Sequence, residues 1–435
     1  MRRLPLPLLA TVFASVFGSA ICLPAFAQDD PFAAGVRTSP WLTPEDERAK
    51  LRVPDGFNVQ LFASEPDINK PINIACDARG RIWVASTIEY PFPAPDDRPG
   101  RDRIVILEDA DGDGHAEKAT TFADGLNIPV GVLPMPDGGA IAFSIPQVMR
   151  FYDDNGDGVA DRREPLLGGS IGRRDTHGMT GSFRRGYDGW IYAHHGFANE
   201  SELTAKDGSS VKMQSGNIYR FRPDGSHIEQ FAWGQVNPFG MDFDERGSLF
   251  SSDCHSKPIS EVLRGAYYQS FGKPHDGLGF APDMIDHSHG STAICGLSIY
   301  EAPDFPEAFR GNAFIGNVMT SQLVRDRIEW RGASPKAVTQ EPLIRSEDPW
   351  FRPVDSRLGT DGALYVADFY NRITCHYEVD LNHRDRESGS GSGASPTATP
   401  PSQAPAKPRG RFTPRRSSDS SPTKTAPSGC APSTS

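Results

Sequence analysis

The feature that most constrains the fold is a short phrase that recurs six times along the chain. In each copy a glycine ends a turn, and an apolar stretch that usually contains an aromatic residue follows closely. Glycine tolerates the positive φ that tight turns require, and the apolar stretch is typical of a buried or half-buried strand. The six glycines lie 50–64 residues apart: Gly80, Gly139, Gly189, Gly247, Gly311 and Gly362.

The length of this repeat indicates the architecture. Most helical solenoid units are shorter, whereas one four-stranded propeller blade needs about 40–50 residues. The sequence therefore predicts an all-β chain in which residues 46–385 form a six-bladed β-propeller. A β-sandwich or barrel with ordinary turns is the alternative, and the regular recurrence of the phrase argues against it.

The two ends of the chain differ in composition from the middle. Residues 1–27 begin with two arginines, continue as an apolar run and end in Ala-Phe-Ala, which is typical of a secretory signal peptide. An uncleaved membrane anchor is the alternative. Residues 28–45 are expected to form an extended lead-in, and residues 386–435, rich in Ser, Pro, Thr and Gly, a disordered tail. We expect an exported protein, periplasmic or extracellular, with at most peripheral membrane contact.

Charge and cysteine content narrow the choice of partners. The formal net charge is −11, which argues against nucleic acid as a partner because phosphate binding needs a basic face.

The predicted propeller contains Cys76, Cys254, Cys295 and Cys375. Either two disulfides or buried free thiols fit these four cysteines, and their spacing does not choose between pairings.

Two acidic loops have the pattern of calcium ligands. Both place oxygen ligands at alternate positions with a glycine after the third, as at the start of an EF-hand-type loop. We expect them to bind Ca²⁺ and to brace neighbouring hairpins, and ion-free Asp/Gly hairpin tips are the alternative. The candidate ligands are Asp109, Asp111, Asp113 and Glu117 in the first loop and Asp153, Asn155, Asp157, Asp161 and Glu164 in the second.

Histidines and other ionisable residues gather between residues 174 and 289, mostly in polar stretches next to predicted strands. Propeller loops of this kind converge on one face, where they supply a general base, an anion clamp or a metal site. Neighbouring strand residues point to opposite sides, so at most one of His194 and His195 faces such a site. The pocket candidates are Arg174, Asp175, His177, His195, His255, Lys257, His275, His287 and His289.

Several longer phrases resemble a known family. Asp175-Thr-His177-Gly, Val236-Asn237-Pro238-Phe-Gly240 and Gly359-Thr-Asp-Gly-Ala-Leu-Tyr-Val-Ala-Asp368 resemble segments of the soluble quinoprotein sugar dehydrogenases. Those proteins are six-bladed propellers that use pyrroloquinoline quinone (PQQ) and calcium. Asp253-Cys-His-Ser-Lys-Pro258 is similar to a phrase of the planctomycete and verrucomicrobial group named as membrane-bound dehydrogenases. The resemblance covers most of residues 50–383.

The resemblance implies roles for three residues. His177 matches the base that takes a proton from a sugar hydroxyl while hydride leaves to the quinone, and Asn237 and Arg352 match positions that contact the cofactor. Other positions of the family's site hold different residues here: Phe197, Val236, Thr320 and Val354.

Three functions therefore remain open. The first is an exported quinoprotein-like dehydrogenase that oxidises a sugar or polyol and passes electrons to an external acceptor such as a cytochrome c, because the sequence contains no haem-attachment motif. The second is a non-catalytic propeller that binds carbohydrate or protein. The third is a calcium-dependent, lactonase-like hydrolase.

Overall fold

The computed structural model describes residues 37–270, 280–371 and 395–399. Almost all regular structure in these ranges is β. One short helix, α1 (Pro44–Arg48), begins at Thr43, whose hydroxyl accepts the Asp46 N–H, and one 3₁₀ turn spans Glu307–Phe309. Within the described part of the chain no helix is long and apolar enough to cross a membrane. The prediction of an all-β chain is confirmed.

Six of the described sheets share one pattern, in which an innermost strand pairs antiparallel with the strand that follows it in the chain. The innermost strands are β3 (Pro71–Cys76), β7 (Val132–Pro134), β12 (Thr180–Arg185), β18 (Pro238–Phe243), β21 (Ile294–Tyr300) and β25 (Pro353–Leu358). The second strands are β4 (Ile82–Ser86), β8 (Ala140–Ser144), β13 (Ile191–His195), β19 (Leu249–Asp253), β22 (Asn312–Asn317) and β26 (Leu364–Asp368). Each second strand begins directly after one of the six predicted glycine turns.

The outer strands complete these sheets. They are β5 (Asp102–Glu108) and β6 (Lys118–Leu126); β9 (Gln147–Tyr152) and β10 (Arg162–Pro165); β16 (Asn217–Phe221) and β17 (Ile228–Trp233); β20 (Ser260–Glu261); and β23 (Gln322–Arg331), β24 (Ser334–Ser346) and β1 (Leu51–Arg52). A further small sheet contains β11 (Gly168–Ser170), β14 (Glu200–Thr204) and β15 (Ser210–Gln214). The sequence did not predict this extra sheet.

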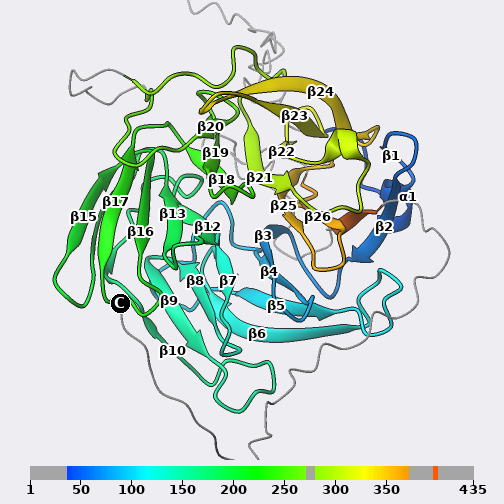
Figure 1. Cartoon of the computed structure of the whole chain (residues 1–435). Coiled ribbons are helices and arrows are strands. Elements are labelled where there is room, and N and C mark those ends of the chain that lie inside the picture. The colour runs from blue at the N-terminus through cyan, green and yellow to red at the C-terminus, as the bar shows by residue number, and fades with distance from the viewer. Residues whose placement is uncertain (1–36, 271–279, 372–394, 400–435) are drawn as a thin grey trace, which may run out of the picture.

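The innermost strands contact one another in a closed series, β3–β7–β12–β18–β21–β25 and back to β3. Figure 1 shows the sheets radiating from this ring, which is the arrangement of a β-propeller. Neighbouring sheets cover both faces of each second strand, so β4, β13, β19, β22 and β26 are buried at every residue. That packing explains why the glycine turns precede apolar runs and not alternating patterns.

The sheet that contains β25 and β26 joins the two ends of the described chain. Its order is β2–β27–β26–β25, with β2 (Asn58–Ala63) at the outer edge and β27 (Ser395–Thr399) as the third strand from the centre. Residues 395–399 of the predicted disordered tail form β27, and disorder of the tail as a whole stays a prediction. Backbone groups make a strand ladder whatever the side chains, so a Ser/Thr/Ala segment can fill the gap between two strands. The rest of the tail lies outside the described residues.

The antiparallel pairing divides the loops between two faces. Each innermost strand begins at the face where its second strand ends, and we call this the top face. Each third strand begins at the top face and ends at the opposite one, so the hairpins β5–β6 and β9–β10 lie at the bottom face. Among the described residues Cys76, Cys254 and Cys295 are free thiols, and Cys375 lies outside them.

Candidate active site around His177

Most pocket candidates lie at the top face, because each precedes an innermost strand or ends or follows a second strand. Arg174, Asp175 and His177 precede β12, Asn237 precedes β18, and Arg352 precedes β25. His195 ends β13, and His255 and Lys257 follow β19. His275 lies outside the described residues. The fold therefore gathers residues far apart in the sequence, as the propeller prediction requires.

His177 is held in one orientation by its neighbour Asp175. The Asp175 carboxylate oxygen Oδ1 lies 3.2 Å from His177 Nδ1 and also accepts the His177 backbone N–H at 2.9 Å. A proton on Nδ1 then donates to Asp175, which leaves Nε2 as the basic nitrogen. Both side chains are about one-fifth exposed, 21% for His177 and 18% for Asp175, so the ring is accessible and still supported.

Asn199 fixes the loop that carries His177. This asparagine is fully buried just after β13. Its Oδ1 accepts the Asp175 N–H at 3.2 Å, and its Nδ2 donates to the carbonyls of Asp175 at 2.7 Å and Gly178 at 2.8 Å. Sequence reasoning missed Asn199 because a single asparagine after a strand carries no motif.

A glycine next to His177 permits close backbone packing. A Cβ on Gly178 would lie 2.3 Å from the Phe197 backbone nitrogen and 2.8 Å from Asn237 Oδ1, both well inside van der Waals contact. Any side chain at this position would push the loop away from β13 and β18. Close packing of the backbone therefore explains why glycine follows His177 in the phrase Asp-Thr-His-Gly.

The loop after β4 packs against the His177 loop, although the sheet of β7 and β8 lies between their two sheets in the ring. The buried Thr176 hydroxyl donates to the Pro91 carbonyl. The Tyr90 ring lies edge-on to the His177 ring with centroids 5.2 Å apart. These two contacts place Tyr90 beside the proposed base.

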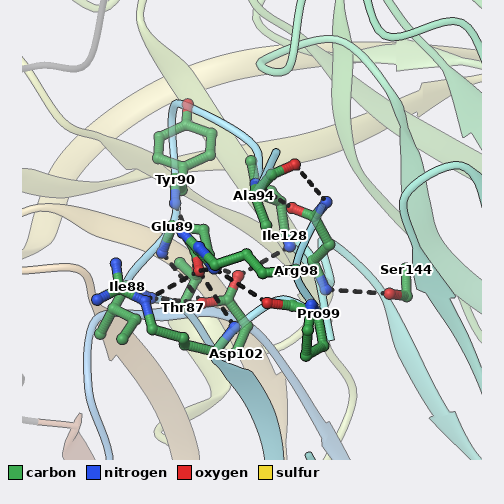
Figure 2. A network of polar contacts seen from close by, with 12 residues as sticks. Thr87, Ile88, Glu89, Tyr90, Ala94, Arg98, Pro99, Asp102, Ile128 and Ser144 are labelled. Carbon is green, nitrogen blue, oxygen red and sulfur yellow. Dashed lines mark hydrogen bonds and ion pairs between the residues drawn. The ribbon is translucent and has the colours of Figure 1, made fainter. Parts of the chain in front are cut away.

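A polar network below Tyr90 holds this loop in place, and Figure 2 shows the Tyr90 ring directed away from it. The buried Asp102 carboxylate accepts four hydrogen bonds, from the Thr87 hydroxyl and from the backbone N–H groups of Ile88, Glu89 and Ile128, at 2.7–3.0 Å. Burial raises the pKa of the Asp102 carboxyl, and these hydrogen bonds oppose that rise.

Glu89 adds a second anchor to the same network. Its side chain, 3% exposed, takes a bidentate pair from Arg98 at 2.6 and 3.0 Å and a third bond from Arg101 Nε at 3.0 Å. Burial by itself raises the pKa of the Glu89 carboxyl, but the arginine hydrogen bonds outweigh it and lower the pKa to about 2. The carboxylate is therefore charged at neutral pH.

Further aromatic rings lie at the top face beyond the Tyr90–His177 contact. Tyr90 also meets Phe369 edge-on at 5.5 Å, and the Lys70 ammonium lies 5.7 Å from the Phe369 centroid. Phe197 lies 6.4 Å from the exposed His255 ring. Aromatic walls with a few placed polar groups are the usual lining of small-molecule sites.

Asn237 and Arg352 do not fit the cofactor role that the resemblance implies. Asn237 is 7% exposed, and its Oδ1 accepts the Phe197 N–H at 3.1 Å. Arg352 is 2% exposed and donates to the backbone carbonyls of Val318 and Asn371. Both side chains hold loops of the top face together, so neither is presented to a bound quinone.

A family profile described as a domain of unknown function (DUF7133) matches residues 43–393, which is most of the chain. The chain belongs to this family. No curated protein sequence matches the chain.

The fold of this DUF7133 member is similar to those of three solved structures. One is a Thermus thermophilus protein assigned as an oxidoreductase (glucose dehydrogenase), with TM-score 0.52, 18% identity, and coverage of 79% of this chain and 100% of that one. The second is the holo form of the PQQ domain of a Coprinopsis cinerea pyranose dehydrogenase, with TM-score 0.52, 12% identity, and coverage of 84% and 98%. The third is a Trichoderma reesei carbohydrate-active enzyme of family AA12, with TM-score 0.51, 13% identity, and coverage of 84% and 100%.

Two other predicted pocket residues of this DUF7133 chain, His195 and Lys257, have partners other than the His177 loop. His195 is fully buried and bridges to the extra sheet, with Nδ1 2.7 Å from the Ser215 carbonyl and Nε2 2.7 Å from the Ser201 hydroxyl. Because side chains alternate along β13, His195 faces the extra sheet and His194 faces the opposite side of β13. Lys257 pairs with Asp283 at 3.3 Å, and Arg174 is exposed beside the His177 loop.

His287 and His289 also have partners other than the His177 loop. Both precede β21, but their rings contact Asp326 of β23, the third strand of the same sheet. The sequence placed them in the central pocket because nothing in it predicted that the long connection before β21 packs against the outer strands.

The two acidic loops lie at the bottom face, opposite His177. In the first, the carboxylates of Asp109, Asp111, Asp113 and Glu117 come within 4.8 Å of one another. In the second, Asp153 and Asp161 accept loop N–H groups, but Glu164 lies on β10 and accepts the Tyr152 hydroxyl at 2.7 Å. The chain enters β10 at Arg162, which carries Glu164 away from the loop. Calcium binding by both loops stays a prediction.

Proposed function

We propose that the protein is a dehydrogenase that oxidises a hydroxyl group of a sugar or polyol, with His177 as the base. One observation carries this proposal: His177 lies at the top face with the Tyr90 ring edge-on to it and Asp175 at its Nδ1. In this arrangement Nε2 takes up the hydroxyl proton, and Asp175 stabilises the resulting imidazolium. Tyr90 and Phe369 would position the apolar face of the substrate.

The fold supports the same reaction class. The solved structures with similar folds are named as a glucose dehydrogenase and as the PQQ domain of a pyranose dehydrogenase. The oxidation also needs a two-electron acceptor, and the resemblance implies PQQ with calcium, followed by an external acceptor such as a cytochrome c. Asn237 and Arg352 do not fit as a clamp for PQQ, so other groups of the top face would have to hold it, and the hydride would pass to that acceptor.

A second candidate is a propeller that binds carbohydrate or protein without catalysis. The burial of Asn237 and Arg352 favours it, since these are the two cofactor-contacting residues that the resemblance carries over. The aromatic rings of the top face would then bind a sugar without any oxidation.

We further propose that the ring of inner strands makes a six-bladed propeller and that the protein is exported to the periplasm or the cell exterior. The closed series of six inner strands supports the blade count, and the first 27 residues support export. The phrase around Asp253 supports kinship with the planctomycete and verrucomicrobial dehydrogenases.

A titration separates the two candidates. Purified protein, freed of metal with a chelator, is titrated with PQQ in the presence and absence of Ca²⁺ while tryptophan fluorescence is followed. The dehydrogenase predicts saturable binding at micromolar PQQ that depends on Ca²⁺. Absence of saturation leaves the binding propeller as the better account. Titration with a sugar panel alone, without quinone, then tests that account.

A further inference from the structure

Two histidines and one aspartate converge on the side of the sheet that contains β21 to β24. His289 Nε2 lies 2.7 Å from Asp326 Oδ2, and His287 Nε2 lies 3.3 Å from Asp326 Oδ1. The two imidazole rings meet edge-on with centroids 5.1 Å apart. One ligand atom from each of the three residues lies within 4.8 Å of the others.

The carboxylate at the centre of this cluster is fully buried, with 0% of the Asp326 side chain exposed. Within the described ranges its only ion-pair partners are the two histidines. The neighbouring Arg325 and Arg327 point to the other side of β23 because strand residues alternate. Burying a carboxylate is costly unless hydrogen bonds or positive charge compensate it, and a metal ion between these three residues would supply that charge.

The donor set suits a transition metal better than calcium. Two imidazole nitrogens and one carboxylate oxygen are a common ligand set for Zn²⁺ and its neighbours, whereas Ca²⁺ prefers oxygen alone. Ligand atoms around tetrahedral Zn²⁺ lie about 3.3 Å apart, close to the separation of His287 Nε2 and Asp326 Oδ1. The Thr339 hydroxyl, opposite Asp326 in the β23–β24 ladder, contacts His287 Nε2 and marks a fourth side of the cluster.

The surrounding structure places these ligands without help from an ion. Asn317, fully buried at the end of β22, donates from Nδ2 to the His289 carbonyl at 2.8 Å. The Met284 carbonyl accepts the Ala337 N–H of β24 at 3.0 Å. His287 is 28% exposed and His289 only 4%, so an ion can reach the site from the His287 side.

We propose that His287, His289 and Asp326 form a site for a divalent transition-metal ion of the Zn²⁺ class. The ion would tie the connection before β21 to the outer strands β23 and β24. The site is separate from the His177 loop and does not depend on the proposed dehydrogenase activity.

Metal titration of the full chain tests this proposal. Chelator-treated protein is titrated with Zn²⁺ by competition against a chromophoric chelator and, separately, with Co²⁺ while visible absorption is recorded. We expect one equivalent of Zn²⁺ to bind with micromolar or tighter affinity and Co²⁺ to give the intense bands of a four-coordinate site. The His289→Ala and Asp326→Asn variants should each bind Zn²⁺ at least 10-fold more weakly.

Two control variants show whether the loss of affinity is specific to this cluster. His227→Ala removes an exposed histidine that lies 2.6 Å from Asp207, and Asp109→Asn alters the first acidic loop. Neither should change Zn²⁺ affinity. Far-UV circular dichroism checks that each variant is folded. The Co²⁺ spectrum of the unaltered protein tests the site even if a variant fails to fold. Three results would each overturn the proposal: no saturation with Zn²⁺, a Co²⁺ spectrum typical of octahedral coordination, or a folded His289→Ala variant with unchanged affinity for Zn²⁺. The three residues would then be a hydrogen-bonded His–Asp cluster without a metal ion.

Discussion

Asn199 and Asp175 hydrogen-bond to each other twice through the Asp175 backbone. Asn199 Oδ1 accepts the Asp175 N–H at 3.2 Å, and Asn199 Nδ2 donates to the Asp175 carbonyl at 2.7 Å. The peptide groups on either side of Asp175 are thereby fixed to the segment between β13 and β14, and Asp175 in turn orients His177. A buried asparagine thus helps to determine where the proposed base lies.

Asn199→Ala should destabilise the protein by about 2–4 kcal/mol, because it leaves the Asp175 N–H and two carbonyls without their partner in a buried place. Urea denaturation gives the free energy of unfolding. Asn58→Ala, at an exposed position at the start of β2, should change it by less than about 0.5 kcal/mol. Equal effects of the two substitutions would show that Asn199 does not anchor the loop.

Glu89 should make the protein sensitive to acid in a defined window. Its pKa is lowered to about 2 in the folded state from roughly 4.3 in the unfolded chain. A lowered folded pKa contributes stability that is present above the unfolded pKa and is lost as the pH falls toward 2.

Glu89→Gln should therefore lower the free energy of unfolding by about 2 kcal/mol at pH 7, because charged hydrogen bonds to two arginines are lost. The difference from the unaltered protein should shrink steadily between about pH 4 and pH 2. Urea titrations at several pH values measure it, with the exposed Glu164→Gln as control. A difference that stays constant with pH would rule out this role for Glu89.

Removal of calcium should lower the melting temperature by a few degrees, because an ion that binds only the folded state stabilises it by mass action. Chelator treatment followed by added Ca²⁺ should reverse the loss, and Mg²⁺ should not. Asp109→Asn should remove part of the response, whereas Asp207→Asn, outside both loops, should leave it unchanged. A melting temperature indifferent to chelator and Ca²⁺ would mean that the loops are ion-free turns.

Local patterns in the sequence predicted the strands well. The six glycine turns are each followed by a second strand, because positive φ and a buried apolar run are both local properties. The top-face position of His177 followed from the same repeat. Neither β27 nor the small sheet of β11, β14 and β15 carries such a pattern, since their pairing depends on which edges the rest of the fold leaves open.

Side-chain partners were harder to predict. Asn237 and Arg352 were assigned to a cofactor by resemblance, yet burial turns them toward backbone groups. His195 was a pocket candidate, but alternation along β13 allowed either it or His194 to face inward, and the Ser201 and Ser215 partners come from residues that no motif marks. The cluster of His287, His289 and Asp326 joins residues about forty positions apart, which only the packed fold reveals.

The most direct test of the account is dye reduction by the full protein, loaded with PQQ and Ca²⁺, over a panel of sugars and polyols. We predict turnover on at least one substrate and a loss of kcat of about 100-fold or more in His177→Ala, the usual contribution of a general base. The His227→Ala variant should keep full activity. Turnover that is unchanged in His177→Ala would contradict the central claim that His177 is the base.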